Sequence, residues 1–221
     1  MGGTPGQNKI SLEIFYFMFQ NINDHISRCV PVSEEDLHFF NSVLEIKKVP
    51  KKTILLHEGD VCNFEAYINK GCVRSYYIDE HGNEVTLQFA IEDWWVSDIA
   101  SFHEHTPSKM FIETLEDCEL LLLSPQTKEQ LLTRIPKLER MFRLMVQKNL
   151  AVLQTRFFKS ISTSAHDKYV DFLQRYPSIP QRVAQHYIAS YLGISPEFLS
   201  KVRTRMAATS GSSRAGRKGD S

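Results

Sequence analysis

Residues 182–206 read RVAQHYIASYLGISPEFLSKVRTRM, and the apolar side chains in this stretch recur at helical spacing. From Gln185 to Leu192 the stretch predicts a short helix, and Gly193 then supplies the positive φ of a tight turn. Ser195 is a strong N-cap, and Pro196 suits the first position of a second helix. Two short helices joined by a turn of about three residues are typical of a helix-turn-helix.

The second of these helices presents an outward set of polar and charged side chains. Glu197 can accept a hydrogen bond from cytosine N4, and Lys201 can donate to guanine O6 and N7. Ser195, Arg203 and Arg205 suit contacts with backbone phosphates. We therefore expect this segment to bind double-stranded DNA, and the alternative is a helix pair whose charged face is only solvated. The candidate DNA-binding residues are Gln185, Tyr187, Ser195, Pro196, Glu197, Ser200, Lys201, Arg203 and Arg205.

The distribution of charge favours a nucleic-acid partner for the C-terminal part of the chain. The whole chain is neutral, with 26 Lys and Arg against 26 Asp and Glu. From Leu150 to Ser221 there are 11 basic and 4 acidic side chains, so the remainder carries 15 and 22. A basic C-terminal part that follows an acidic N-terminal part indicates that the former binds nucleic acid.

Upstream, the sequence from Ile46 to Leu123 consists of short β-rich runs separated by turn signals. Gly59, Gly71 and Gly82 lie in three of these turns. Several strands at intervals of roughly 10 residues, separated by glycine turns, favour an antiparallel barrel or sandwich. The expected strands are Ile54–Leu56, Ala66–Ile68, Val73–Ile78, Val85–Ala90 and Cys118–Leu123.

Helical patterns flank the β-rich region on both sides. Before it, residues 13–43 are expected to be helical, with one helix starting at Ser33. After it, apolar side chains recur every three or four residues from Lys137 to about Ile161, and they occupy two faces of the helix. The second face needs a partner beyond the β domain, and a symmetry-related copy is favoured over packing within one chain. A further helix begins at Ser164 and ends before Pro177.

The chain from about Glu34 to Met206 resembles the Crp/Fnr family of bacterial regulators, particularly the subfamily common in Bacteroidetes. The resemblance rests on HEGD (57–60), YINKGCVRSYY (67–77), DEHGNE (79–84), QFAIEDWW (88–95) and QHYIASYLGISPEFLSKVR (185–203). It implies an α+β fold with three parts: an antiparallel β-roll of the cyclic-nucleotide-binding-like jelly-roll type, a long dimerisation helix and a C-terminal winged helix-turn-helix. It also implies a homodimer on a near-palindromic DNA operator, with RNA polymerase as a candidate partner.

This resemblance sets the expected domain boundaries. Residues 1–136 are expected to form the β-roll sensor domain with its N-terminal helices, and residues 137–161 the dimerisation helix. Residues 162–206 are expected to form the DNA-binding domain. Residues 207–221 are rich in Gly and Ser and are expected to be a disordered tail.

Within the second helix of the motif, the resemblance places Glu197 on the family's base-reading glutamate. Lys201 falls where an arginine is common, and Pro196 replaces another base-contacting arginine. Because lysine and proline both lack the bidentate guanidinium fork, the operator is expected to differ from that of the best-known members.

The resemblance also locates a candidate effector pocket at Asp98, Ile99, Ser108 and Lys109. Members that bind cyclic AMP hold its ribose-phosphate with a Gly-Glu-Leu segment and an Arg-Ser pair. Here the corresponding stretches are Ser97-Asp98-Ile99 and Ser108-Lys109, so the arginine is absent from its place. A phosphodiester needs a cation and hydrogen-bond donors. We therefore expect a small-molecule effector other than cyclic AMP, or none.

Other chemistry has little support in the sequence. The four cysteines lack the close spacing of zinc or iron–sulfur ligands and are expected to be reduced thiols in the cytosol. His103 and His105 form a single HxH pair, and no nucleophile elbow or phosphate loop is present. We expect a cytoplasmic protein with no catalytic residues, no metal, no cofactor and no membrane association. The alternative function is a ligand-binding β-roll module without DNA-binding activity.

Overall fold

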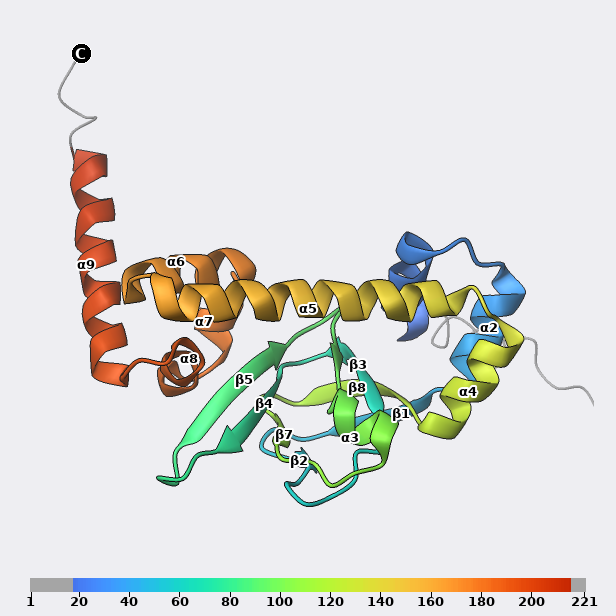
Figure 1. Ribbon diagram of the computed structural model, residues 1–221. Helices are drawn as coiled ribbons and strands as arrows, with labels where there is room; N and C mark the ends of the chain where they lie inside the picture. The colour runs from blue at the N-terminus through green and yellow to red at the C-terminus, as the bar shows by residue number, and fades with distance from the viewer. Residues whose placement is uncertain (1–17, 216–221) are drawn as a thin grey trace, which may run out of the picture. The chain divides into compact units, whose positions relative to one another are not determined.

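The computed structural model describes residues 18–215, and the chain divides into two compact units. Unit 1 comprises Met1–Tyr77 and Gln88–Ala151, and unit 2 comprises Ile78–Leu87 and Val152–Ser221. The division crosses a long helix, α5, and a β-hairpin formed by β4 and β5 (Figure 1). The tip of that hairpin therefore belongs with the C-terminal helices.

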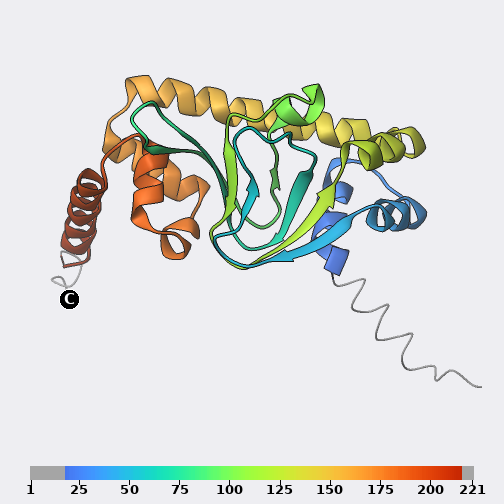
Figure 2. The ribbon, with the colours of Figure 1, turned by 90° about the horizontal axis from the view of Figure 1, so that it is seen from below.

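Two four-stranded sheets form the β-roll (Figure 2). The strand orders are β1-β8-β3-β6 and β2-β7-β4-β5, so each sheet joins strands that are far apart in the sequence. The pairs β1–β8, β3–β8, β3–β6, β2–β7 and β4–β7 are antiparallel, as predicted. The strands are β1 (Glu45–Val49), β2 (Ile54–Leu56), β3 (Glu65–Lys70), β4 (Val73–Ile78), β5 (Glu84–Ala90), β6 (Trp95–Val96), β7 (Phe111–Thr114) and β8 (Cys118–Leu123).

The five predicted strands correspond to β2, β3, β4, β5 and β8, but β1, β6 and β7 were not predicted as strands. Strand β1 has the sequence EIKKV with four exposed residues, so it lacks an apolar run. Strands β6 and β7 are two and four residues long, which is too short for an alternating pattern to stand out.

The turn between β3 and β4 shows how tightly the roll is closed. Gly71 has a φ of 107°, and a Cβ built on it would lie 2.5 Å from the Sγ atom of Cys118. Only glycine fits this position without displacing β8. Burial raises the pKa of the Cys118 thiol to about 11, so this sulfur stays protonated at neutral pH.

Unit 1 has two apolar cores: one contains residues from both sheets, and in the other helices pack against β3, β6 and β8. A helix over residues 18–29 contributes Phe19, and the part of the expected helix before residue 18 lies outside the described residues. Helix α2 (Glu34–Ser42) starts with a capping box in which Ser33 and Asp36 exchange hydrogen bonds, as predicted. The other helices of this unit are α3 (Ile99–Glu104), α4 (Pro125–Arg134) and the first half of α5 (Leu138–Ser162).

Unit 2 is built from helices packed around aromatic side chains. After the end of α5 come α6 (Ala165–Arg175), α7 (Ile179–Arg182), α8 (Gln185–Leu192) and α9 (Pro196–Ala215). The Ser164 hydroxyl accepts a hydrogen bond from the Asp167 N–H and caps α6 at the predicted residue. Phe172, Tyr176 and Tyr191 contact one another in the core, with ring centroids 5.3 to 5.9 Å apart.

Two expectations for the C-terminal part need correction. Within residues 18–215 every named strand lies between Glu45 and Leu123, so the predicted wing is not present in the described chain. Helix α9 also continues past Met206 to Ala215, where a disordered tail was expected. The last six residues of the tail, 216–221, lie outside the described residues.

No helix in the described part of the chain has both the length and the apolar character of a membrane span.

Candidate nucleic-acid interface and effector pocket

The helix-turn-helix has the turn and caps that the sequence predicts. Gly193 ends α8 with a φ of 67°, and the Ile194 N–H donates back to the Ala189 carbonyl at 3.1 Å. The Ser195 hydroxyl accepts a hydrogen bond from the Phe198 N–H at 3.2 Å and caps α9. These local bonds fix the angle at which the chain enters the second helix.

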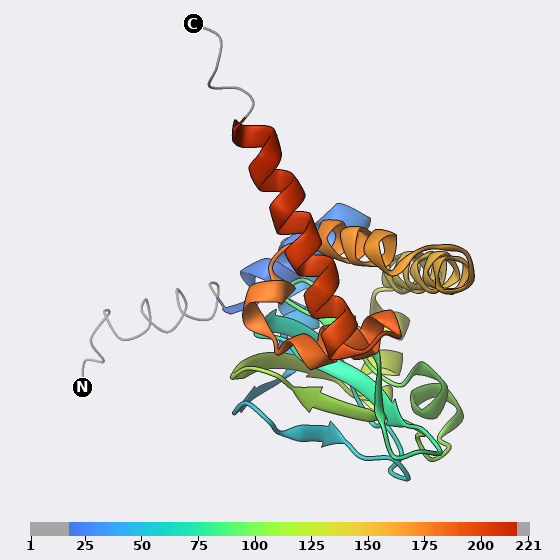
Figure 3. The ribbon, with the colours of Figure 1, turned by 90° about the vertical axis from the view of Figure 1, so that its left-hand side faces the viewer.

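One face of each helix is buried and holds the pair together. Ile188 and Ala189 of α8 and Leu199 and Val202 of α9 are buried. Ala189 is fully buried, and because protein interiors are closely packed, we expect a larger side chain there to disturb the crossing of the two helices. Beyond this contact, the C-terminal half of α9 extends past the other helices of unit 2, as the red helix in Figure 3 shows.

The outward face carries most of the predicted DNA-binding residues. Glu197, Lys201 and Arg205 follow one another at intervals of four along α9 and are exposed, so they form one stripe. Gln185, Ser195, Pro196 and Ser200 are also exposed, whereas Tyr187 and Arg203 are half-buried. The Tyr187 ring lies against His186, with centroids 4.0 Å apart.

Glu197 is held in its charged form at the start of α9. Its pKa is lowered, mainly by a hydrogen bond from its own backbone N–H, with further contributions from the Ser195 hydroxyl and the nearby Lys201. An ionised carboxylate is also favoured by the positive end of the helix dipole. Glu197 is therefore ready to act as a hydrogen-bond acceptor.

In unit 1 the structure brings together two of the four candidate effector-pocket residues. Asp98 caps α3 by accepting from the Ser101 N–H at 3.2 Å, and the Ser108 hydroxyl donates to its Oδ2 atom at 2.8 Å. Asp98 and Ser108 are both buried, at 7% and 3% exposure. Ile99 and Lys109, their neighbours in the chain, are exposed. The pair thus places a carboxylate, not a cation, at this position.

Two buried ion pairs in unit 1 were missed by sequence reasoning. The Arg74 Nη2 and Nε atoms donate to Glu113 Oε2 at 2.7 and 2.9 Å, between β4 and β7. The Lys128 ammonium donates to Glu65 Oε1 at 2.9 Å, between α4 and β3. The partners are 39 and 63 residues apart, so no local pattern could have joined them.

Arg156 is a further residue that the sequence did not single out. Its guanidinium donates to the backbone carbonyls of Thr86, Leu87 and Tyr191, and it lies 4.0 Å from the Tyr191 ring centre. The Ser190 hydroxyl accepts from the Thr86 N–H at 2.9 Å and donates to the Glu84 carbonyl at 2.7 Å. Within unit 2, the hairpin tip is therefore bonded to α8 and to the end of α5.

The described residues contain neither a cluster of metal-ligating side chains nor a disulfide. These residues contain no group of three or more His, Cys, Asp or Glu side chains placed to hold a metal ion. His103 and His105 are exposed, and none of the four cysteines forms a disulfide.

The described chain thus combines a β-roll, a long helix and a capped helix-turn-helix. Residues 46–134 match the cyclic nucleotide-binding domain. Over 192 residues the chain is 26% identical to the regulatory protein HlyX of Actinobacillus pleuropneumoniae, covering 80% of this chain and 79% of HlyX. Over 102 residues it is 28% identical to the cAMP-activated global transcriptional regulator CRP of Salmonella typhimurium, covering 46% of this chain and 49% of that protein. The chain thus spans about half the length of the CRP proteins it matches.

Solved structures share this fold. The c-di-GMP responsive global regulator CLP of Xanthomonas campestris matches with a TM-score of 0.65 and 19% identity, over 80% of this chain and 93% of CLP. FixK2 of Bradyrhizobium japonicum matches with a TM-score of 0.67 and 15% identity, over 76% of this chain and 86% of FixK2. The domain match and the similarity to HlyX support a Crp/Fnr-family regulator, and the solved structures show the same fold.

Proposed function

We propose that the protein is a sequence-specific DNA-binding transcriptional regulator that acts in the cytoplasm as a homodimer. The observation that carries this proposal is the exposed stripe of Glu197, Lys201 and Arg205 on α9, directly after a capped turn. An acid and a base at the start of such a helix can reach base edges in the major groove, while the arginines reach phosphates. The similarity to regulators along the chain supports the same function over a β-roll module without DNA binding.

The dimer is proposed from the exposed apolar face of α5. Five large apolar residues recur at intervals of three or four and are 44% to 73% exposed: Val146, Leu150, Leu153, Phe157 and Ile161. A continuous exposed stripe of this size is typical of an interface. A second copy of the same helix offers a complementary surface by symmetry. Two such chains would present two α9 helices to successive major grooves, roughly 34 Å apart.

The direct test is selection of bound sequences from a random pool of duplex DNA. We expect a near-palindromic consensus, because a twofold protein reads two half-sites. A selected pool without any consensus would refute sequence-specific binding, whatever the oligomeric state.

Single substitutions on α9 should separate base reading from phosphate contact. Glu197→Ala is expected to relax base preference at one operator position, with a loss of about 1–3 kcal/mol in discrimination. Arg203→Ala or Arg205→Ala is expected to weaken binding to all sequences and to reduce the slope of log affinity against log salt by about 1. Binding isotherms at several salt concentrations measure both effects, with the exposed Glu139→Ala on α5 as a control. Equal effects on all sequences for Glu197→Ala would contradict its assignment as a base reader.

The effector, if one binds in the β-roll, is proposed to differ from cyclic AMP. A cyclic phosphodiester placed beside Asp98 would meet a buried carboxylate whose partners, Ser101 and Ser108, are already engaged. Like charges at close range in a buried site repel strongly. We expect no saturable heat when cyclic AMP is titrated into the protein in a calorimeter. Saturable binding that also shifts DNA affinity would contradict this prediction.

A further inference from the structure

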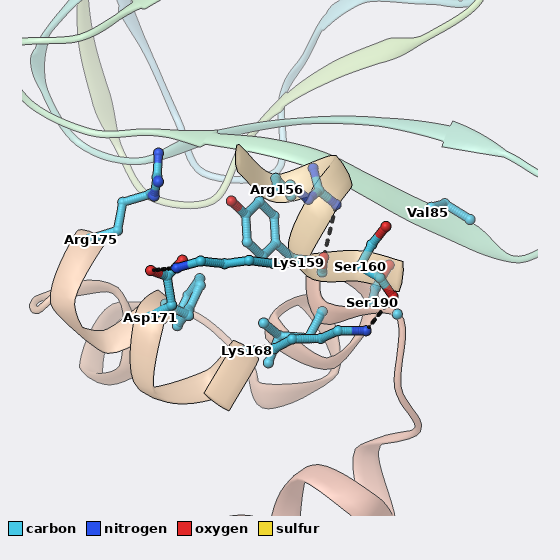
Figure 4. Close-up of a pocket in the computed structure, with 12 residues that line it drawn as sticks. Val85, Arg156, Lys159, Ser160, Lys168, Asp171, Arg175 and Ser190 are labelled. Atoms are coloured by element: carbon cyan, nitrogen blue, oxygen red, sulfur yellow. Dashed lines mark hydrogen bonds and ion pairs between the residues drawn. The ribbon is translucent and has the colours of Figure 1, made fainter. Parts of the chain in front are cut away.

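A hollow of about 160 Å³ lies inside unit 2, and neither the base-reading helix nor the β-roll pocket uses it. The last turns of α5, helix α6, the end of α8 and the hairpin residue Val85 surround it (Figure 4). Its size is close to that of cavities of about 150 Å³ that accept a benzene molecule. The space is therefore sufficient for a small organic ligand.

The inner wall of the hollow is apolar. Phe172, Tyr191 and Leu192 are buried and line it, and Val85 is half-buried on the hairpin side. Gly193 also lines it, and a Cβ built on this glycine would have no atom within 4 Å. An apolar or aromatic body placed here would be removed from water, which is worth about 25 cal/mol per Å² of apolar surface.

The lining is positively charged. Arg156, Lys159, Lys168 and Arg175 carry four positive charges, and Asp171 is the one acidic residue among the lining residues described. The Lys159 ammonium is paired with Asp171, and Arg156 is bonded to backbone carbonyls. This leaves the charges of Lys168 and Arg175 without a carboxylate in the lining to balance them.

Lys168 and Arg175 are placed on the same face of α6. They are seven residues apart, which is two helical turns and roughly 10 Å along the axis. Figure 4 shows them separated, with the Lys159–Asp171 pair between them. The Lys168 Nζ donates to the Ser160 carbonyl at 2.9 Å, which uses one of its three protons. The ammonium can therefore still donate to a ligand.

We propose that this hollow binds a small organic monocarboxylate with an apolar body about the size of a benzene ring. The body would lie against Phe172 and Tyr191, and the carboxylate would pair with Lys168 or Arg175. A bare inorganic anion would leave the apolar wall in contact with water, and a neutral aromatic molecule would leave the two cations unbalanced. The ligand therefore needs both a negative charge and an apolar body.

Calorimetric titration of the full chain with benzoate tests this proposal. We expect saturable binding of one benzoate per chain, and at least about tenfold weaker binding of both benzyl alcohol and inorganic phosphate, since each lacks one property. In Lys168→Met/Arg175→Met, benzoate affinity should fall at least about tenfold, because methionine keeps the apolar stem but removes the charge. Lys148→Met, on the exposed face of α5, is the matched control and should bind benzoate like the unaltered protein. Circular dichroism of each variant checks folding.

Three results would overturn the proposal: no saturable benzoate binding, phosphate binding as tightly as benzoate, or benzoate binding that the double variant leaves unchanged. If the double variant instead loses affinity for every duplex DNA and benzoate never binds, the two cations are DNA backbone contacts. The titration contains no DNA, so its outcome is independent of the proposed function.

Discussion

Replacing Leu153 and Phe157 together by aspartate is expected to yield a folded monomer that has lost at least about 100-fold in affinity for operator DNA. Both side chains are more than half exposed in the single chain, so the substitutions remove little packing from its own core. In a symmetric α5 pair, four carboxylates would instead lie in the apolar seam. Burying unpaired charges costs several kcal/mol for each ion, which exceeds the 1.5–3 kcal/mol gained from each buried apolar side chain.

DNA affinity falls because a monomer has only one α9 helix and can therefore contact only one half-site. Two linked half-site contacts can exceed the affinity of one by about 10²–10⁴. Light scattering at several protein concentrations gives the mass, and binding isotherms on the selected operator give the affinity. Lys148→Asp places a carboxylate on an exposed, polar position of the same helix and should remain dimeric. A double variant that stays dimeric would show that α5 is not the interface.

Glu65→Ala is expected to lower the free energy of unfolding by about 3–5 kcal/mol, the typical cost of leaving one buried charge without its partner. The Lys128 side chain is 9% exposed, and its ammonium lies 4.4 Å from the centre of the Phe142 ring and 5.3 Å from that of Phe102. Cation–π contacts offset only part of the missing carboxylate, because they contribute about 2 kcal/mol when desolvated. Without Glu65, the Lys128 ammonium would therefore be buried beside aromatic rings with no carboxylate partner.

Urea unfolding followed by circular dichroism measures this effect, and a fall in Tm of roughly 6–20 °C should accompany it. The matched comparison is Glu65→Leu/Lys128→Met, in which both charges are replaced by apolar side chains. That double variant should be more stable than Glu65→Ala, since an apolar pair of similar volume can replace a buried ion pair at little cost. If Glu65→Ala lowered the free energy of unfolding by less than about 1 kcal/mol, this would mean that water reaches Lys128.

The parts of the fold that sequence reasoning predicted are those encoded by neighbouring residues. Gly193 and Ser195 specify a turn and a cap within a few positions, so the bounds of α8 and the start of α9 could be read directly. The same holds for the caps at Ser33 and Ser164. These helix starts and ends depend only on residues close together in the chain, and the structure confirms the predictions made for them.

The parts that were missed depend on residues distant in the sequence. Asp98 and Ser108 of the expected effector pocket meet through a hydrogen bond, while Ile99 and Lys109 are exposed, and the pocket itself stays a prediction. Strand β1 could not be recognised because its stability comes from pairing with β8 rather than from its own side chains. The wing was inferred from resemblance alone, and in the described residues α9 continues as a helix where an added hairpin would have to start.

The bonds that Arg156 and Ser190 make to the hairpin tip end on main-chain atoms. Every residue carries a backbone carbonyl, so the bonds to Glu84 and Leu87 do not depend on the side chains of those two residues, whereas the Thr86 side chain is fully buried. Over evolutionary time the tip can therefore change its surface while it keeps its attachment, provided that Arg156 and Ser190 stay. Comparison of orthologues should accordingly show two fixed positions opposite a variable hairpin.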